Sequence, residues 1–293
     1  MDHFSFLSKD FLEQAYKQYD TVIFQGEWTS DHKQIIIVDK DSSHGLDAIV
    51  GHHLEQGKHI LLILSTASLD ELLSVTQWVN NQITIVNTHA GLGAFEATGK
   101  WDTWDISKSM SYGFDVYDPH TTEELFKQIL GASGKVYIRT NTHLLSAENY
   151  PVLKWEWAKK MLFSLQWQWF SGWHWTIIWL WSSIVDIFHT GVLLQEAWES
   201  MDCFITSAVD IAFSENLINS IRESESLWIV ADQHNNQLWE TSLKAKLWDL
   251  WLFETEIKFI SPRLDKITSF LPEYIYEQSE MDGQWIAKRI LGK

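Results

Sequence analysis

Residues 83–93 read ITIVNTHAGLG, in which the β-branched run Ile83–Asn87 is an expected strand that leads into a loop with two glycines. Other runs with β-strand character lie on either side of it, at Gln34–Val38, His59–Leu64, Phe114–Tyr117 and Val136–Arg139. Helical patterns separate these runs, at Leu46–Glu55, Leu69–Val79, Ile106–Tyr112 and Thr122–Leu130. Because strands alternate with helices over short connections, the sequence predicts a parallel sheet that is covered by helices on both faces.

The second half of the chain repeats this alternation after a break around residues 144–171, where Pro151 stands among mixed polar residues. The expected strands are Thr176–Leu180, Cys203–Ser207, Leu227–Ala231 and Ile257–Ser261. The expected helices are Ile184–Trp198, Ser214–Glu223 with Ser214 as the N-cap candidate, Gln237–Leu247 and Glu280–Ile290. We therefore predict an α/β protein with two consecutive three-layer α/β/α domains and mostly parallel sheets, at residues 1–147 and 173–293, joined by a linker at 148–172.

The composition is that of a chain with a substantial core and an acidic surface. Of the 293 residues, 45% are hydrophobic and 21% are charged, and the formal net charge is −17. This charge, without any basic run, argues against nucleic acid or an anionic membrane as a partner. A single cysteine, Cys203, excludes a disulfide framework and a cysteine-built zinc site. With no signal-peptide pattern and no apolar run of about 18 residues, we expect a cytoplasmic protein without a membrane span.

Tryptophan is over-represented at places that ordinarily take glycine. The chain has 18 tryptophans but only 14 glycines, although glycine usually makes up about 7% of a protein. Residues 167–181 read WQWFSGWHWTIIWLW, and Trp248 and Trp251 flank the expected end of a helix, a common place for glycine. We hypothesise that many of these tryptophans are glycines in the cell, because a gene that uses UGA for glycine was translated with UGA as tryptophan. The alternative is a tryptophan-rich binding surface, such as a carbohydrate platform.

The order of several motifs resembles the transketolase family. Residues 83–93, Asp105-Ile-Ser, the stretch FDVYDP at 114–119 and VYIR at 136–139 are similar to the pyrimidine-binding domain of that family. The second half resembles its C-terminal domain through TIIWLWSSI at 176–184, LLQEA at 193–197, ITSAVDIAFS at 205–214 and IVADQH at 229–234. Together the motifs span about residues 5–290. The match improves when glycine is read at Trp179, Trp181, Trp239 and Trp251.

The resemblance implies an enzyme that depends on thiamine diphosphate and is split between two chains. In the family a separate diphosphate-binding domain holds the phosphates through Mg²⁺, and this sequence has neither that domain nor its GDG-type metal loop. The expected function is therefore the C-terminal subunit of a split transketolase, which transfers a two-carbon ketol unit between sugar phosphates. An N-terminal, diphosphate-binding partner would hold the Mg²⁺ and share the cofactor within a homo- or hetero-oligomer.

Three other functions remain open at this point. Within the same fold, the chain resembles a deoxyxylulose phosphate synthase fragment or the beta subunit of a 2-oxo acid dehydrogenase. A non-catalytic relative, which pairs with or regulates another thiamine enzyme, is the alternative from a different class.

The family's catalytic glutamate is not found where the resemblance would place it. Counting back from the turn at Leu54–Lys58 reaches Ser43, and Asp41 is the nearest candidate carboxylate if the loop is two residues longer. Such a carboxylate protonates the pyrimidine ring and helps to form the reactive ylide. An ordinary solvated acidic turn is the competing interpretation of Asp41.

The resemblance implies further site residues near the cofactor. His89, in the THAGLG loop, would lie near the thiazolium and the substrate, unless it only makes structural hydrogen bonds. Gly91 in the same loop would contact the cofactor. The hydrophobic side chains of Leu62, Leu64 and Leu69 would form an apolar slot for the pyrimidine ring. No aromatic residue occurs at 64–69 and no histidine precedes Asp105, so either the pocket has been rebuilt or the chain no longer catalyses.

Three other groups of polar residues have simpler interpretations. Arg139 ends a strand and is expected to be an ion-pair partner rather than a phosphate ligand, and Cys203 is expected in the core. Asp232 and His234 follow a parallel strand, the place where α/β proteins gather their sites.

Overall fold

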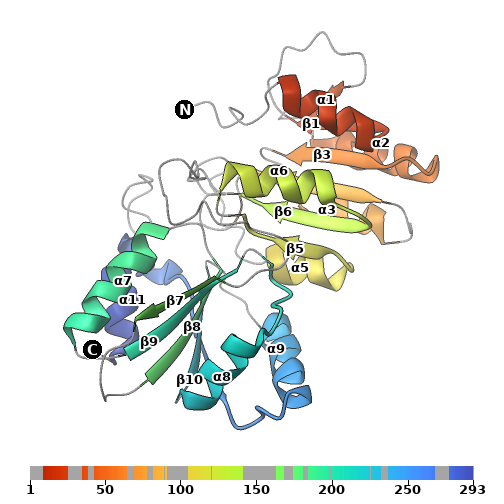
Figure 1. Cartoon of the computed structure of the whole chain (residues 1–293). Helices are drawn as coiled ribbons and strands as arrows, with labels where there is room; N and C mark the ends of the chain where they lie inside the picture. The colour runs from red at the N-terminus through yellow and green to blue at the C-terminus, as the bar shows by residue number, and fades with distance from the viewer. Residues whose placement is uncertain are drawn as a thin grey trace. The chain divides into compact units, whose positions relative to one another are not determined.

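The chain forms two compact units, Met1–Trp155 and Glu156–Lys293. The computed structural model describes residues 9–25, 35–38, 43–64, 69–77, 82–88, 90, 105–119, 121–140, 163–167, 174–180, 184–197, 200–206, 208–224, 226–231, 237–267 and 277–292. Both units are α/β with mostly parallel sheets, which confirms the predicted fold class (Figure 1).

The first unit contains a six-stranded sheet in which every described pairing is parallel. The strands follow the order β2-β1-β3-β4-β6-β5. Their bounds are β1 Thr21–Gln25, β2 Ile35–Val38, β3 Ile60–Leu64, β4 Ile83–Asn87, β5 Asp115–Tyr117 and β6 Lys135–Arg139. Strands β1, β3 and β4 are buried along their whole length, as expected for a parallel sheet that is covered on both faces.

The helices that the structure describes beside this sheet are α1 Lys9–Gln18, α2 Ser43–Glu55, α3 Leu69–Thr76, α5 Asp105–Ser111 and α6 Thr122–Gly131. Helices α1 and α6 pack together on one face, where Phe11 and Leu125 join Val22, Leu61 and Ile138 in a single buried cluster. Helix α3 contacts both α2 and α5, which form the opposite layer (Figure 1). Alternate residues of each strand therefore enter separate apolar layers.

The second unit contains a five-stranded sheet in the order β11-β10-β8-β9-β7. Its strands are β7 Phe163–Trp167, β8 His174–Leu180, β9 Ser200–Ile205, β10 Ser226–Ala231 and β11 Glu256–Ile260. Strand β7 pairs with β9 antiparallel, and the other described pairings are parallel. The sequence analysis did not predict β7, which lies within the expected linker at 148–172.

The helices of this unit are α7 Ile184–Glu196, α8 Glu215–Glu223, α9 Gln237–Asp249 and α11 Gly283–Ile290, with a short 3-10 helix, η3, at Leu264–Lys266. Ser214 is the N-cap of α8 as predicted, because its side chain accepts a hydrogen bond from the Leu217 amide at 3.3 Å. Among the helices that the structure describes, none is long and apolar enough to cross a membrane.

Helices α7 and α11 approach each other closely at Gly283. A Cβ atom at this position would lie 2.8 Å from the Asp186 carbonyl oxygen and 2.8 Å from the His189 Cβ. The Gly283 amide donates to the Asp186 carboxylate at 3.0 Å, and Thr190 Oγ1 donates to the Gly283 carbonyl at 3.1 Å. The contact therefore needs a residue without a side chain.

Candidate functional site

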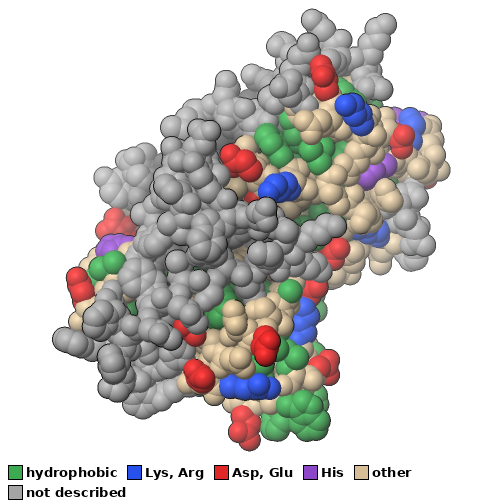
Figure 2. Space-filling model, viewed as in Figure 1, with side chains coloured by type: hydrophobic (Ala, Val, Ile, Leu, Met, Phe, Trp, Pro, Cys, Tyr) green, Lys and Arg blue, Asp and Glu red, His purple; other side chains and the backbone are tan. Residues whose placement is uncertain are grey.

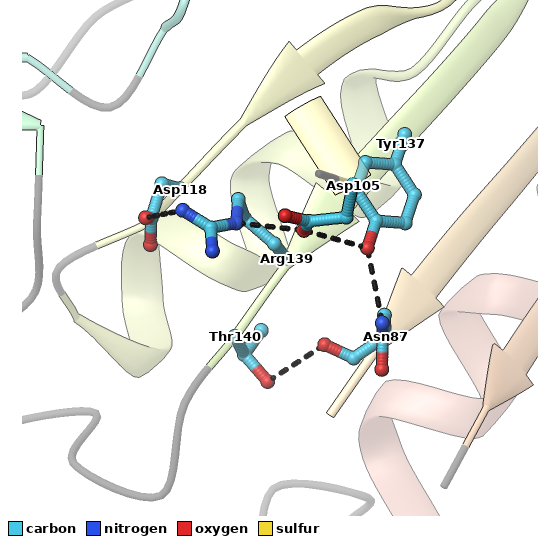
Figure 3. A network of polar contacts seen from close by, with 6 residues as sticks. All are labelled: Asn87, Asp105, Asp118, Tyr137, Arg139 and Thr140. Carbon is cyan, nitrogen blue, oxygen red and sulfur yellow. Dashed lines mark hydrogen bonds and ion pairs between the residues drawn. The ribbon is translucent and has the colours of Figure 1, made fainter. Parts of the chain in front are cut away.

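The carboxyl ends of β3, β4 and β6 meet at one edge of the first sheet. Loops at this edge of an open parallel sheet are where α/β proteins bind ligands. The residues that end these strands are Leu64, Asn87 and Arg139. Asn87 and Arg139 belong to a polar network that also includes Asp105 from the start of α5 and Asp118 directly after β5 (Figure 3).

Arg139 is the charged centre of this network. Its Nε lies 2.9 Å from Oδ2 of Asp105, and its Nη1 lies 3.1 Å from Oδ2 of Asp118. The Arg139 side chain is 1% exposed, and those of Asp105 and Asp118 are 0% and 5% exposed. This geometry confirms the interpretation of Arg139 as an ion-pair partner. Because the three groups are out of water, each depends on the others for compensation of its charge.

Tyr137 and Asn87 extend the network from β6 to β4. The Tyr137 hydroxyl donates to Asp105 Oδ2 at 3.0 Å, and Asn87 Nδ2 donates to the Tyr137 hydroxyl oxygen at 3.0 Å. Tyr137 is fully buried. Buried polar groups whose hydrogen bonds are all made to one another favour a single arrangement of the strands that carry them.

Main-chain hydrogen bonds tie the strand ends together beyond the sheet itself. The Thr140 amide donates to the Asn87 carbonyl at 2.8 Å, and the Ala90 amide donates to the Thr140 carbonyl at 3.1 Å. The Leu64 carbonyl accepts from both the amide and the hydroxyl of Thr88, at 3.0 and 2.9 Å. These bonds fix the points at which the chain leaves β3, β4 and β6.

Chemically, this network is a rigid support rather than a set of acid–base groups. Both buried carboxylates face the same guanidinium, and Tyr137 adds a hydrogen bond to Asp105. Carboxylates that are paired in this way are stabilised in position. The network therefore holds the base from which the loops after β4 and β6 begin.

Of the residues predicted to lie near the cofactor, the structure describes the leucines of the apolar slot. Leu64 is described and 1% exposed at the end of β3, and Leu69 is the first residue of α3. Asp41, His89 and Gly91 lie outside the described residues. In the sequence, Asp41 lies between β2 and α2, and His89 lies two residues after the end of β4.

The sequence analysis missed the joint role of Asp105, Asp118, Tyr137 and Asn87. Each of these residues lies within a motif quoted for the family resemblance, but they are separated by up to 50 residues in the chain. For three of them the available signal was their position, since Asn87 ends β4, Asp118 follows β5 and Asp105 begins α5. Tyr137 lies in the middle of β6 and gives no such signal.

Asp232 and His234 also lie outside the described residues. Cys203 is buried in β9, as predicted. Burial raises the pKa of the Cys203 thiol to about 12, with a smaller contribution from the charge of Asp202. The neutral thiol is therefore a core group.

The fold has close counterparts among solved structures, although the sequence matches no family model and no curated protein. A chain described as "Split gene transketolase, inactive beta4 tetramer" is 12% identical and has a TM-score of 0.70. The alignment covers 97% of this chain and 95% of that one. The chain has a transketolase fold.

Two single-chain transketolases show the same likeness over part of their length. The enzyme from Campylobacter jejuni subsp. jejuni is 12% identical, with a TM-score of 0.66, and the alignment covers 94% of this chain and 44% of that one. A mutant transketolase from Pichia stipitis has the same identity and TM-score, with coverage of 93% and 42%. The present chain thus spans the split-gene chain almost fully and less than half of each single-chain enzyme.

Proposed function

We propose that the chain is the C-terminal subunit of a split, thiamine-diphosphate-dependent transketolase. The observation that carries this proposal is the nearly complete overlap with a chain from a split-gene transketolase. With an N-terminal, diphosphate-binding subunit, it would transfer a two-carbon ketol unit between sugar phosphates in the cytoplasm.

The proposal includes a partner because of how much of its structural neighbours the chain spans. It overlaps less than half of the single-chain transketolases, and the split-gene chain that it resembles is described as inactive in its β4 tetramer. Within the described residues, no cluster of three or more His, Cys, Asp or Glu could hold a metal ion. We therefore assign the Mg²⁺ and the diphosphate contacts to the partner.

The described residues fit the base of a cofactor site. The buried aliphatic side chain of Leu64 ends β3, and the Arg139 network fixes the neighbouring ends of β4 and β6. When bound, thiamine diphosphate supplies the nucleophilic carbon. In the proposal Leu64, Leu69 and Gly91 border its pyrimidine ring, Asp41 holds a proton at the ring nitrogen, and His89 contacts the substrate.

A reconstitution assay tests this proposal together with the role of Asp41. The chain is mixed with the diphosphate-binding subunit, thiamine diphosphate, Mg²⁺, a ketose phosphate as donor and an aldose phosphate as acceptor, and ketol transfer is measured. Asp41→Ala is expected to abolish turnover while the denaturation midpoint stays unchanged. Asp47→Ala is the matched control and is expected to keep turnover. Full turnover in Asp41→Ala would remove Asp41 from the mechanism.

A non-catalytic subunit is the second candidate function. It is favoured by Ser43, which stands where the resemblance would place the catalytic glutamate, and by the pairing of Asp105 and Asp118 with Arg139. A complex that forms without binding thiamine diphosphate would support it. Turnover with a 2-oxo acid, or with pyruvate and glyceraldehyde phosphate, would instead favour the dehydrogenase or the deoxyxylulose phosphate synthase alternative.

A further inference from the structure

Helix α9 ends in a hydrogen-bonding pattern that normally contains glycine. The Leu252 amide donates to the Leu247 carbonyl at 2.8 Å, and the Trp251 amide donates to the Trp248 carbonyl at 3.0 Å. These are the two bonds of a Schellman motif, in which the residue just past the helix end adopts the left-handed conformation. Trp251 occupies that position.

The backbone of Trp251 has the conformation that the motif demands, with a φ of +59°. In the part of the chain that the structure describes, Glu280 is the other non-glycine residue with a positive φ, and the remaining five are glycines. A side chain strains this conformation because its Cβ approaches the following carbonyl oxygen. A bulky residue such as tryptophan is a marked exception there.

The indole of Trp251 gains little to offset this strain. It is 82% exposed, and two neighbours at the same helix end, Trp248 and Phe253, are 67% and 51% exposed. The Trp248 and Phe253 rings lie 5.2 Å apart between centroids. Large apolar side chains gathered at a helix end add exposed apolar surface without adding to the core.

Buried tryptophans of the same unit show a related misfit. Among the described residues, no hydrogen-bond acceptor serves the indole N–H of Trp175, Trp179 or Trp228, although these atoms are buried. Buried indole N–H groups usually have a partner. Trp239 differs, because its Nε1 donates to the Val209 carbonyl at 3.1 Å and its ring packs 5.6 Å from that of Phe259.

We infer that residue 251 is glycine in the protein that its cells make, encoded by a UGA codon that these cells read as glycine. Glycine adopts a positive φ without strain and is the usual residue at this place in the motif. The excess of tryptophan over glycine in the composition is thereby explained at one named position, residue 251. It also removes one of the large apolar side chains exposed at the end of α9.

Peptide sequencing tests the assignment directly. Trypsin cleaves after Lys246 and Lys258 and releases residues 247–258, a peptide that contains both Trp248 and Trp251. The protein is purified from its own cells, and tandem mass spectrometry reads this peptide, with recombinant chain carrying tryptophan at both positions as the reference. Glycine at 251 is the expected result, and tryptophan at 251 would overturn the inference.

Denaturation of three recombinant variants gives an independent readout. Trp251→Gly is expected to raise the urea midpoint because glycine adopts a positive φ without strain. Trp251→Ala keeps a Cβ in the left-handed conformation, so its urea midpoint is expected to rise by less. Trp248→Gly is the matched control, since Trp248 is also exposed but lies inside α9, where glycine weakens a helix. A midpoint that falls in Trp251→Gly, as it should in Trp248→Gly, would contradict the inference.

Discussion

His59 lies directly before β3 and is held by groups from the end of α1 and the start of β1. Its Nδ1 faces the Gln18 carbonyl at 3.0 Å, and its ring lies 4.3 Å from that of Tyr19. Burial lowers the pKa of His59 below its usual 6.5, while the Gln18 carbonyl and the charge of Asp20 oppose this shift. No described residue lies within hydrogen-bond reach of its buried Nε2, which also favours the neutral ring.

The lowered pKa of His59 predicts a loss of stability in mild acid. The His59 ring binds a proton more readily in the unfolded chain than in the folded one. The neutral ring therefore contributes fully to the free energy of unfolding above pH 6.5, and this contribution is lost as the pH falls through 6.5 towards the pKa in the folded chain. His59→Asn keeps a donor for Gln18 but does not titrate, so urea midpoints of this variant should change less between about pH 7.5 and 5.5. His52→Asn, at an exposed position, should keep the wild-type pH dependence; an unchanged slope in His59→Asn would contradict the assignment.

Single residues were predictable where their role depends on local sequence. Ser214 was recognised as a helix cap because its partner, Leu217, is three residues away. Arg139 was recognised as an ion-pair partner, but its partners Asp105 and Asp118 were not, because they come from other elements. The sequence shows that a charged residue in a buried strand needs a partner of opposite charge. It does not show which residue, distant in sequence, provides that charge.

At the scale of elements, the sequence located strands that are buried and continuous. Strand β4 has the predicted bounds, and β3 and β6 differ from prediction by one residue. Helix α1, strand β1 and strand β7 were missed. In the described sheet, strand β7 lies at the edge beside β9. Its sequence FSLQW mixes polar and apolar residues, so it has no marked apolar run.

The contact of α7 with α11 predicts a strong response to one methyl group. Gly283→Ala places a Cβ 2.8 Å from Asp186 and His189 atoms, so overpacking should lower the free energy of unfolding by about 1–3 kcal/mol. Gly51→Ala is the control, because its Cβ would meet nothing within 4 Å inside α2 and should raise stability by about 0.5–1 kcal/mol. Urea denaturation measures both; equal effects would show that α7 and α11 are not in close contact.

The Arg139 network predicts a large loss of stability when its cation is removed. Arg139→Met removes the cation that pairs with the buried Asp105 and Asp118 and should cost about 3–5 kcal/mol in the free energy of unfolding. Lys127→Met removes the same charge from the exposed face of α6 and should change stability by less than about 0.5 kcal/mol. A small effect of Arg139→Met in chemical denaturation would show that the network is solvated.

At the scale of the whole molecule, sequence order predicted the fold class because each unit repeats one simple rule, a strand followed by a helix. The site was less predictable, since it is assembled from strand ends that are distant in sequence. On the face shown in Figure 2, the described Lys and Arg side chains are scattered among those of Asp and Glu.

The central proposal is that this chain is half of a thiamine enzyme, and native mass spectrometry of the complex isolated from its own cells tests it most directly. The proposal predicts an assembly in which this chain accompanies a diphosphate-binding subunit, with thiamine diphosphate and Mg²⁺ bound. An assembly of this chain alone, or one with a partner but no thiamine diphosphate, would contradict it and support the non-catalytic alternative.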